Sequence, residues 1–139
     1  MSTERLKEIM EKLRNIQSEC SETGKVITED YGEVPSPLAL FDVCIMVPII
    51  ESTNSILFRI ETYLFLRNLR EVMVFSEGKE KLERVIQYNY NSTRNFIKDR
   101  IQMYNRTPIK DTRCVEILHQ WEDILHDTIR ALEDCEKLD

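Results

Sequence analysis

The chain has 139 residues, 42% of them hydrophobic and 32% charged, and its formal net charge is −6 at pH 7. This length predicts a single domain, 1–139, that buries one core without help from metals or disulfides. Only three glycines and four prolines are present, and a domain of many tightly turned strands needs more of both. The composition therefore excludes most all-β architectures and predicts an all-α helical bundle.

The N-terminus and the cysteines indicate an intracellular, cytoplasmic protein with free thiols. Residues 1–13, MSTERLKEIMEKL, are charged and helix-forming, unlike a cleavable secretion signal. The four cysteines are Cys20, Cys44, Cys114 and Cys135. None belongs to a C-x-x-C pair, which argues against a zinc knuckle and against a thioredoxin-type redox motif. We therefore expect reduced cysteines rather than disulfides.

The first expected helix spans residues 3–23. Its apolar residues alternate at three- and four-residue spacing, which predicts a narrow seam of coiled-coil type. They are Leu6, Ile9, Leu13, Ile16 and Cys20. Gly24 follows directly, and a glycine in this position is typical of a helix C-terminal cap. Residues 28–36, TEDYGEVPS, predict a loop.

Residues 37–75 are the most apolar part of the chain and are predicted to form the centre of the bundle. The run LALFDVCIMVPII at 38–50 is shorter than the ~20 apolar residues that a membrane span needs. Ser36 followed by Pro37 is a typical helix start. A break is predicted near Pro48 or at the polar residues 52–54. We therefore expect two helices here, the second over about 55–75 and apolar on nearly all sides.

Asp42 is the single charge within 38–50. An ionised carboxylate alone in a core is very costly. We expect it at the edge of the helix, against a partner protein, or beside one of the cations that follow it in the chain. These cations are Arg59, Arg67 and Arg70.

Two more helices are expected after Ser76-Glu77-Gly78, the clearest break in the second half. The first spans 79–105, and NRTPIKD at 105–111 predicts a turn. The last begins between 108 and 111, ends at 137 and has the most regular apolar seam. Its members are Leu118, Trp121, Leu125, Thr128, Leu132 and Cys135. The expected bundle therefore has about five helices.

The sequence favours a non-catalytic function, either as a protein–protein interaction module or as a small helical subunit of a larger assembly. A second apolar row beside the seam of the last helix widens its apolar face, and 55–75 carries more apolar surface than a small bundle needs. We therefore expect self-association or a protein partner. The candidate partner-binding residues are Leu118, Trp121, Leu125 and Leu132.

A basic stretch gives the second candidate function, contact with single-stranded RNA or DNA. Residues 94–113 hold six cations and two acids, whereas 114–139 hold eight acids and two cations. Cations near aromatic rings are typical of single-strand binding. The candidate contacts are Arg94, Lys98 and Arg106. The alternative is that these cations pair with acids of the last helix, such as Glu133, and the net negative charge disfavours phosphate binding.

The third candidate is a metal-dependent enzyme that uses EILHQWEDILHD at 116–127. The candidate ligands are Glu116, His119, Asp123 and His126. A carboxylate and an imidazole three residues apart share a helix face and can chelate one metal ion. If the leucine seam faces the core, however, all four side chains face solvent. The chain also lacks Gly-rich phosphate loops and nucleophile motifs, so we expect no metal, no cofactor and no enzymatic activity.

Overall fold

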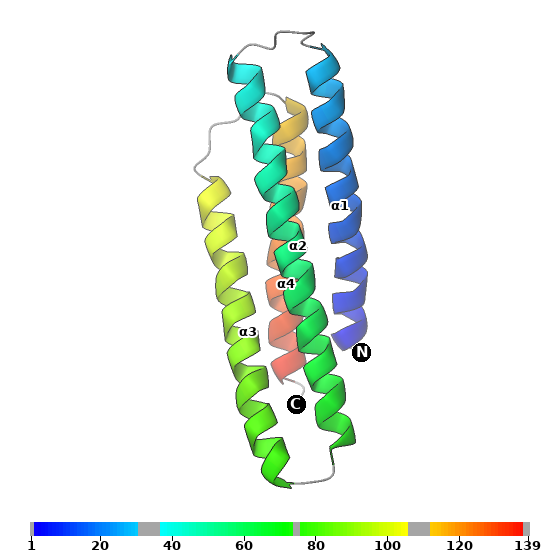
Figure 1. The fold of residues 1–139 in the computed structure, drawn as a ribbon, viewed down its shortest axis with the longest axis vertical. Helices are drawn as coiled ribbons and strands as arrows, with labels where there is room; N and C mark the ends of the chain where they lie inside the picture. The colour runs from blue at the N-terminus through cyan, green and yellow to red at the C-terminus, as the bar shows by residue number, and fades with distance from the viewer. Residues whose placement is uncertain (1, 31–36, 74–75, 106–111, 138–139) are drawn as a thin grey trace.

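The computed structural model is an up-and-down bundle of four antiparallel helices (Figure 1). They are α1 (Ser2–Asp30), α2 (Pro37–Val72), α3 (Ser76–Asn105) and α4 (Thr112–Lys137). The structure describes the backbone of 2–30, 37–73, 76–105 and 112–137, with side chains throughout these ranges except at 2, 27–28, 30, 37–45 and 76. No strand occurs in these ranges, so the predicted all-α class is confirmed, whereas the predicted count of about five helices is wrong.

The count is wrong because α2 is one helix where two were expected. Pro48 lies inside it, although proline removes one backbone hydrogen bond and normally kinks or ends a helix. The buried seam of α2 continues in phase across the proline, from Met46 and Ile49 to Ile56. A break would remove these apolar side chains from the core, so tertiary packing overrides the local signal.

The polar residues at 52–54 do not end α2 either, because their side chains are engaged in tertiary contacts. Thr53 Oγ1 donates to the carbonyl oxygen of Ile49 at 2.7 Å and accepts from the indole nitrogen of Trp121 at 2.9 Å. Asn54 accepts from the amide of Gln17 on α1 at 2.6 Å. Such side chains favour turns when they compete for their own backbone. Here Thr53 bonds within the helical ladder and also accepts from α4, and Asn54 accepts from α1.

Gly24 was expected to cap the first helix, but α1 continues to Asp30. Glycine inside a helix costs only about 1 kcal/mol relative to alanine, so it permits a helix end without forcing one. Residues 31–36 and 106–111 lie outside the described part of the chain, and so do the predicted turn in the second range and the side chain of Asp42.

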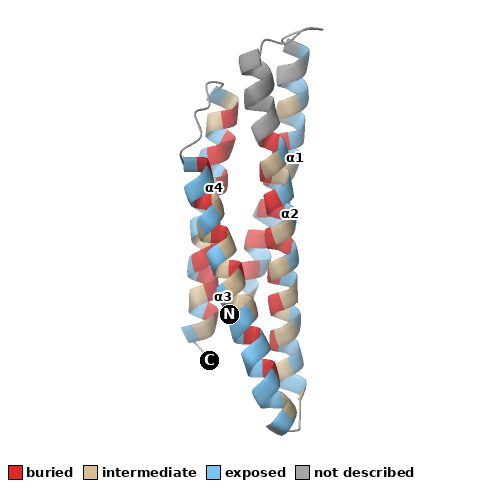
Figure 2. Cartoon of the chain, turned by 60° about the vertical axis from the view of Figure 1, so that its left-hand side comes forward, coloured by how far each residue is buried: buried red, intermediate tan, exposed pale blue. Residues whose placement is uncertain are grey.

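The core lies along the axis of the bundle and is built from the predicted seams. Figure 2 shows buried residues on the facing sides of the helices and exposed residues on their outer sides. The whole predicted seam of α1, Leu6 to Cys20, is buried, and so is that of α4, Leu118 to Cys135. α1 packs along both α2 and α4, whereas α3 packs more closely on α2 than on α4. The helical periodicity of these seams is therefore confirmed.

The helices differ in length, and this leaves one end of the bundle thinner than the rest. In Figure 1 the lower ends of α2 and α3 extend beyond the end of α4. Arg67 of α2 already meets the last turn of α4, where its Nη1 donates to the carbonyl oxygen of Cys135 at 3.1 Å. The α2 residues that follow Arg67 therefore lie beside α3 at the projecting end.

Candidate functional site

The four candidate partner-binding residues on α4 lie in the core. Leu118, Trp121, Leu125 and Leu132 are all buried. The wide apolar face of α4 is covered by α1 on one side and by α3 on the other. A partner would reach these side chains only if α4 left the bundle, so an interaction surface of the folded chain has to lie elsewhere.

The outer face of α2 carries a row of exposed apolar residues, interrupted by the partly exposed Thr62, which we call the α2 stripe. Its members are Phe58, Thr62, Phe65, Leu69 and Val72, spaced 4-3-4-3 along the helix. Phe58, Phe65 and Val72 expose 70%, 65% and 72% of their surface. Apolar residues at this spacing form the seam of a helix that packs against another helix, yet none of these three is covered by the described part of the chain.

The stripe lies opposite the core because of the helical period. The buried seam of α2 passes through Ile60 and Tyr63. Phe58 precedes Ile60 by two residues and Phe65 follows Tyr63 by two, which turns each phenylalanine by about 200° from the core. α2 is thus apolar on two opposite faces, one that builds the bundle and one that faces solvent.

Exposed apolar side chains continue from the stripe onto α3. Val85 and Tyr88 expose 49% and 76% of their surface, and both lie on the same helix face as Ser92, seven and four residues away. Arg59 of α2 donates to Ser92 Oγ at 2.8 Å, so this face of α3 borders α2. Together the exposed side chains present on the order of 600 Å², the upper end for the largest apolar patch of a typical monomer.

Polar groups border the stripe on both sides. On the α1 side, Glu61 pairs with Arg14 at 3.4 Å, and both side chains are half-exposed. On the α3 side, the guanidinium groups of Arg59 and Arg100 lie 4.7 and 4.6 Å from the ring centre of Phe96. An apolar centre with a polar, charged rim is the usual layout of a protein–protein interface.

Of the basic residues proposed for nucleic acid, Arg94 is already paired within the bundle. The Nε of Arg94 pairs with Glu133 of α4 at 3.2 Å, which confirms for Arg94 the alternative that it balances the acidic last helix. Lys98 is partly exposed, and Arg106 lies outside the described residues. The sequence missed the stacking of Arg59 on Phe96, because the two are distant in sequence and no local pattern links them.

We expect no nucleic-acid complex below about 10 μM protein in a gel-shift titration with single-stranded RNA and DNA at low salt. The physical reason is that Arg94 already has a carboxylate partner and that the net charge of −6 repels phosphate. A tight, salt-sensitive shift that disappears in the double variant Arg94→Glu, Lys98→Glu would contradict this expectation.

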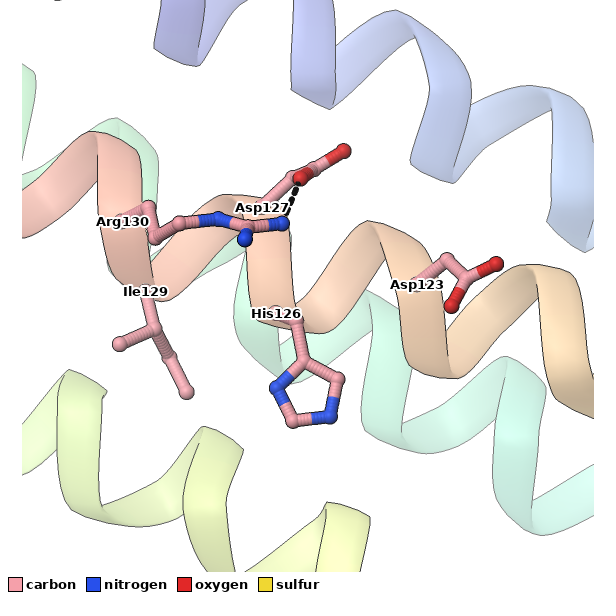
Figure 3. A pocket seen from close by; sticks show the side chains of 5 residues that line it. All are labelled: Asp123, His126, Asp127, Ile129 and Arg130. Carbon is pink, nitrogen blue, oxygen red and sulfur yellow. Dashed lines mark hydrogen bonds and ion pairs between the residues drawn. The ribbon is translucent and has the colours of Figure 1, made fainter.

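The candidate metal ligands on α4 face solvent, as the leucine seam predicts. Glu116, His119, Asp123 and His126 are all exposed. Asp123 and His126 line an open hollow of about 530 Å³, shown in Figure 3 with the other three residues that border it. There the His126 ring points away from Asp127, whose carboxylate pairs with Arg130. No group of three or more metal-ligating side chains occurs among the described residues.

Comparison of the chain with protein-family models, with curated proteins and with solved structures gave no match. Among the described helices, none combines the length and the apolarity that crossing a membrane requires.

Proposed function

We propose that the chain is a non-catalytic protein-interaction module and that it binds its partner through the α2 stripe. The observation that carries this proposal is the row of exposed apolar residues, from Phe58 to Val72, at the spacing of a helix-packing seam. Burying it together with its continuation on α3, Val85 and Tyr88, removes on the order of 600 Å² of apolar surface from water. At about 25 cal/mol per Å² this is a large driving force for association.

The surface suits a helical partner better than a small ligand. The stripe is the convex side of one helix, whereas sites for small molecules are concave and enclose most of the ligand. An amphipathic helix or helix pair with its own 4-3 seam packs into such a row by placing side chains between successive members. The proposed role is therefore assembly, with the bundle as the rigid support of α2.

A photocrosslinker placed on the stripe tests the proposed function. Benzoylphenylalanine in place of Phe65, in cells that naturally express the chain, is expected to give discrete crosslinked protein species. They should survive nuclease and disappear when Leu69→Glu is added, because a charge beside position 65 opposes apolar burial. The matched control places the crosslinker at Gln120, an exposed site on α4, where we expect weak or no products. Absence of a product from position 65, or a nuclease-sensitive one, would rule out the proposed function.

A further inference from the structure

We propose that the partner covering the α2 stripe is a second copy of this chain, with the two α2 helices antiparallel around a two-fold axis at Phe65. The inference rests on the proposed function, because it names the occupant of the same surface. Three features of the stripe support it: its symmetry about Phe65, its area and the distribution of charge at its rim.

The stripe is nearly symmetrical about its central residue. Phe58 and Val72 lie seven residues before and after Phe65, and Thr62 and Leu69 lie three before and four after it. In an antiparallel pair centred on Phe65, each Phe58 meets Val72 of the other copy. Thr62 then lies near Leu69, and the two Phe65 rings meet each other. A two-fold interface requires a self-complementary surface, and this order of larger and smaller side chains provides one.

The area fits a dimer as well. The apolar side chains of the stripe and its continuation on α3 expose on the order of 600 Å² per copy. Specific protein–protein interfaces bury about 800 Å² per partner, including the polar rim. The exposed face of α2, with the side chains that border it, is therefore close to the size that a stable dimer needs.

Charge at the rim is compatible with this arrangement. Glu61, on the α1 side, lies four residues before the axis, and Asn68 lies three residues after it. In the antiparallel pair Glu61 of one copy therefore faces Asn68 of the other. The two Glu61 carboxylates lie eight residues apart along the helix direction, about 12 Å. The arrangement thus avoids opposing like charges at its centre.

Analytical ultracentrifugation of the purified chain tests the inference. At 10–100 μM, roughly the range in which a weak dimer is populated, we expect about twice the 16.5 kDa of the chain. Phe65→Asp should weaken the dimer by about a hundredfold or more, because it places two carboxylates at the centre of the interface. Val26→Asp is the matched control, since Val26 is also exposed but lies on α1, outside the stripe; it should leave the dimer intact.

Cysteines introduced on the stripe test the antiparallel register, compared with the unsubstituted chain and its four native cysteines. In Phe65→Cys the two new thiols meet at the axis, within disulfide distance, so mild oxidation should give a covalent dimer. In Phe58→Cys they lie 14 residues apart along the helices, about 21 Å, so little covalent dimer is expected. Equal crosslinking at both positions would overturn the antiparallel arrangement, and a monomer throughout the concentration range would overturn self-association. If the chain is a monomer, the photocrosslinking experiment still tests the proposed function, because a crosslinked product would then contain a different protein.

Discussion

Replacing Trp121 with alanine is expected to lower the free energy of unfolding by about 3–5 kcal/mol, the usual cost of deleting a buried aromatic side chain. Trp121 is fully buried. Its indole nitrogen donates to Thr53 Oγ1 at 2.9 Å, and its ring meets Tyr104 edge to face at 5.2 Å between centres. The substitution leaves a large cavity where α4 meets α2 and α3. Urea unfolding followed by circular dichroism measures the loss.

A matched control separates burial from aromatic content. Tyr88→Ala also deletes a large ring, but Tyr88 exposes 76% of its surface in the single chain, so for the monomer its cost should stay within about 0.5 kcal/mol. Thr53→Val keeps the side-chain shape but removes the hydroxyl that accepts from Trp121 and donates to the Ile49 carbonyl oxygen; it should cost about 1–3 kcal/mol, because it leaves the buried indole N–H unsatisfied. Equal effects of Trp121→Ala and Tyr88→Ala would contradict the placement of Trp121 in the core.

The seams of α1 and α4 could be predicted from the sequence because they depend on local spacing alone. An amphipathic helix repeats its apolar residues with the helical period whatever it packs against. The partners of polar core groups could not be predicted in this way. Trp121 and Thr53 are 68 residues apart, and only the packing of α4 on α2 brings them together.

The number of helices was mispredicted because Pro48 and residues 52–54 are local signals that tertiary contacts override. Proline at position 48 removes one hydrogen bond, whereas Met46 and Ile49 on either side of it are buried, and so is Thr53 within 52–54. The sequence pattern reflects the hydrogen bond lost at proline, but it does not include the burial of neighbouring side chains against other helices. The same limit applies to Gly24, which lies inside α1.

The sequence predicted that the helix carrying the α2 stripe is apolar, but not which of its faces is exposed. The pattern of 55–75 indicated apolar residues on nearly all sides of a helix, but it could not tell which side the bundle covers. Core and stripe residues of α2 are chemically alike: Ile60 is buried and Phe65 is exposed because α1, α3 and α4 cover one face only. For the same reason the apolar pattern of α4 predicts a partner surface, although the bundle itself covers that face.

At the end of α4, a buried arginine ties the helix to α2. Arg67 exposes 5% of its surface. Its Nη1 donates to the hydroxyl of Tyr63 at 3.1 Å and lies 3.5 Å from a carboxylate oxygen of Glu136. The Tyr63 hydroxyl donates to the same carboxylate. Burial and the hydrogen bond to Glu136 raise the pKa of Tyr63 above its usual 10.

Glu136→Ala is therefore expected to lower the free energy of unfolding by about 2–4 kcal/mol. The substitution removes the carboxylate beside the buried guanidinium of Arg67. An uncompensated buried charge costs far more free energy than the intact ion pair contributes to stability. Glu133→Ala is the matched control, because it lies one turn earlier on α4 and its pair with Arg94 is about one third exposed on both sides. Its cost should be at most about 1 kcal/mol. Similar losses in the two variants, measured by urea unfolding at pH 7, would show that the Arg67 cluster is not buried as the structure has it.

The raised pKa of Tyr63 contributes to the pH dependence of stability, as do the pKa values of Tyr90 and Tyr104, which burial also raises. Below pH 10 Tyr63 is protonated in both the folded and the unfolded chain, so its contribution to stability is complete. As the pH rises above 10, the unfolded chain loses the phenolic proton while the folded chain keeps it, so stability falls with pH until the folded pKa is reached. In Glu136→Ala one cause of the raised pKa is absent, so Tyr63 should ionise at lower pH.

Absorbance at 295 nm and circular dichroism, followed together through an alkaline titration, measure both the ionisation of tyrosine and the loss of folded structure. In the wild type, tyrosine ionisation should coincide in part with unfolding. If every tyrosine ionised near pH 10 in the fully folded wild type, the buried hydrogen bond from Tyr63 to Glu136 would be excluded.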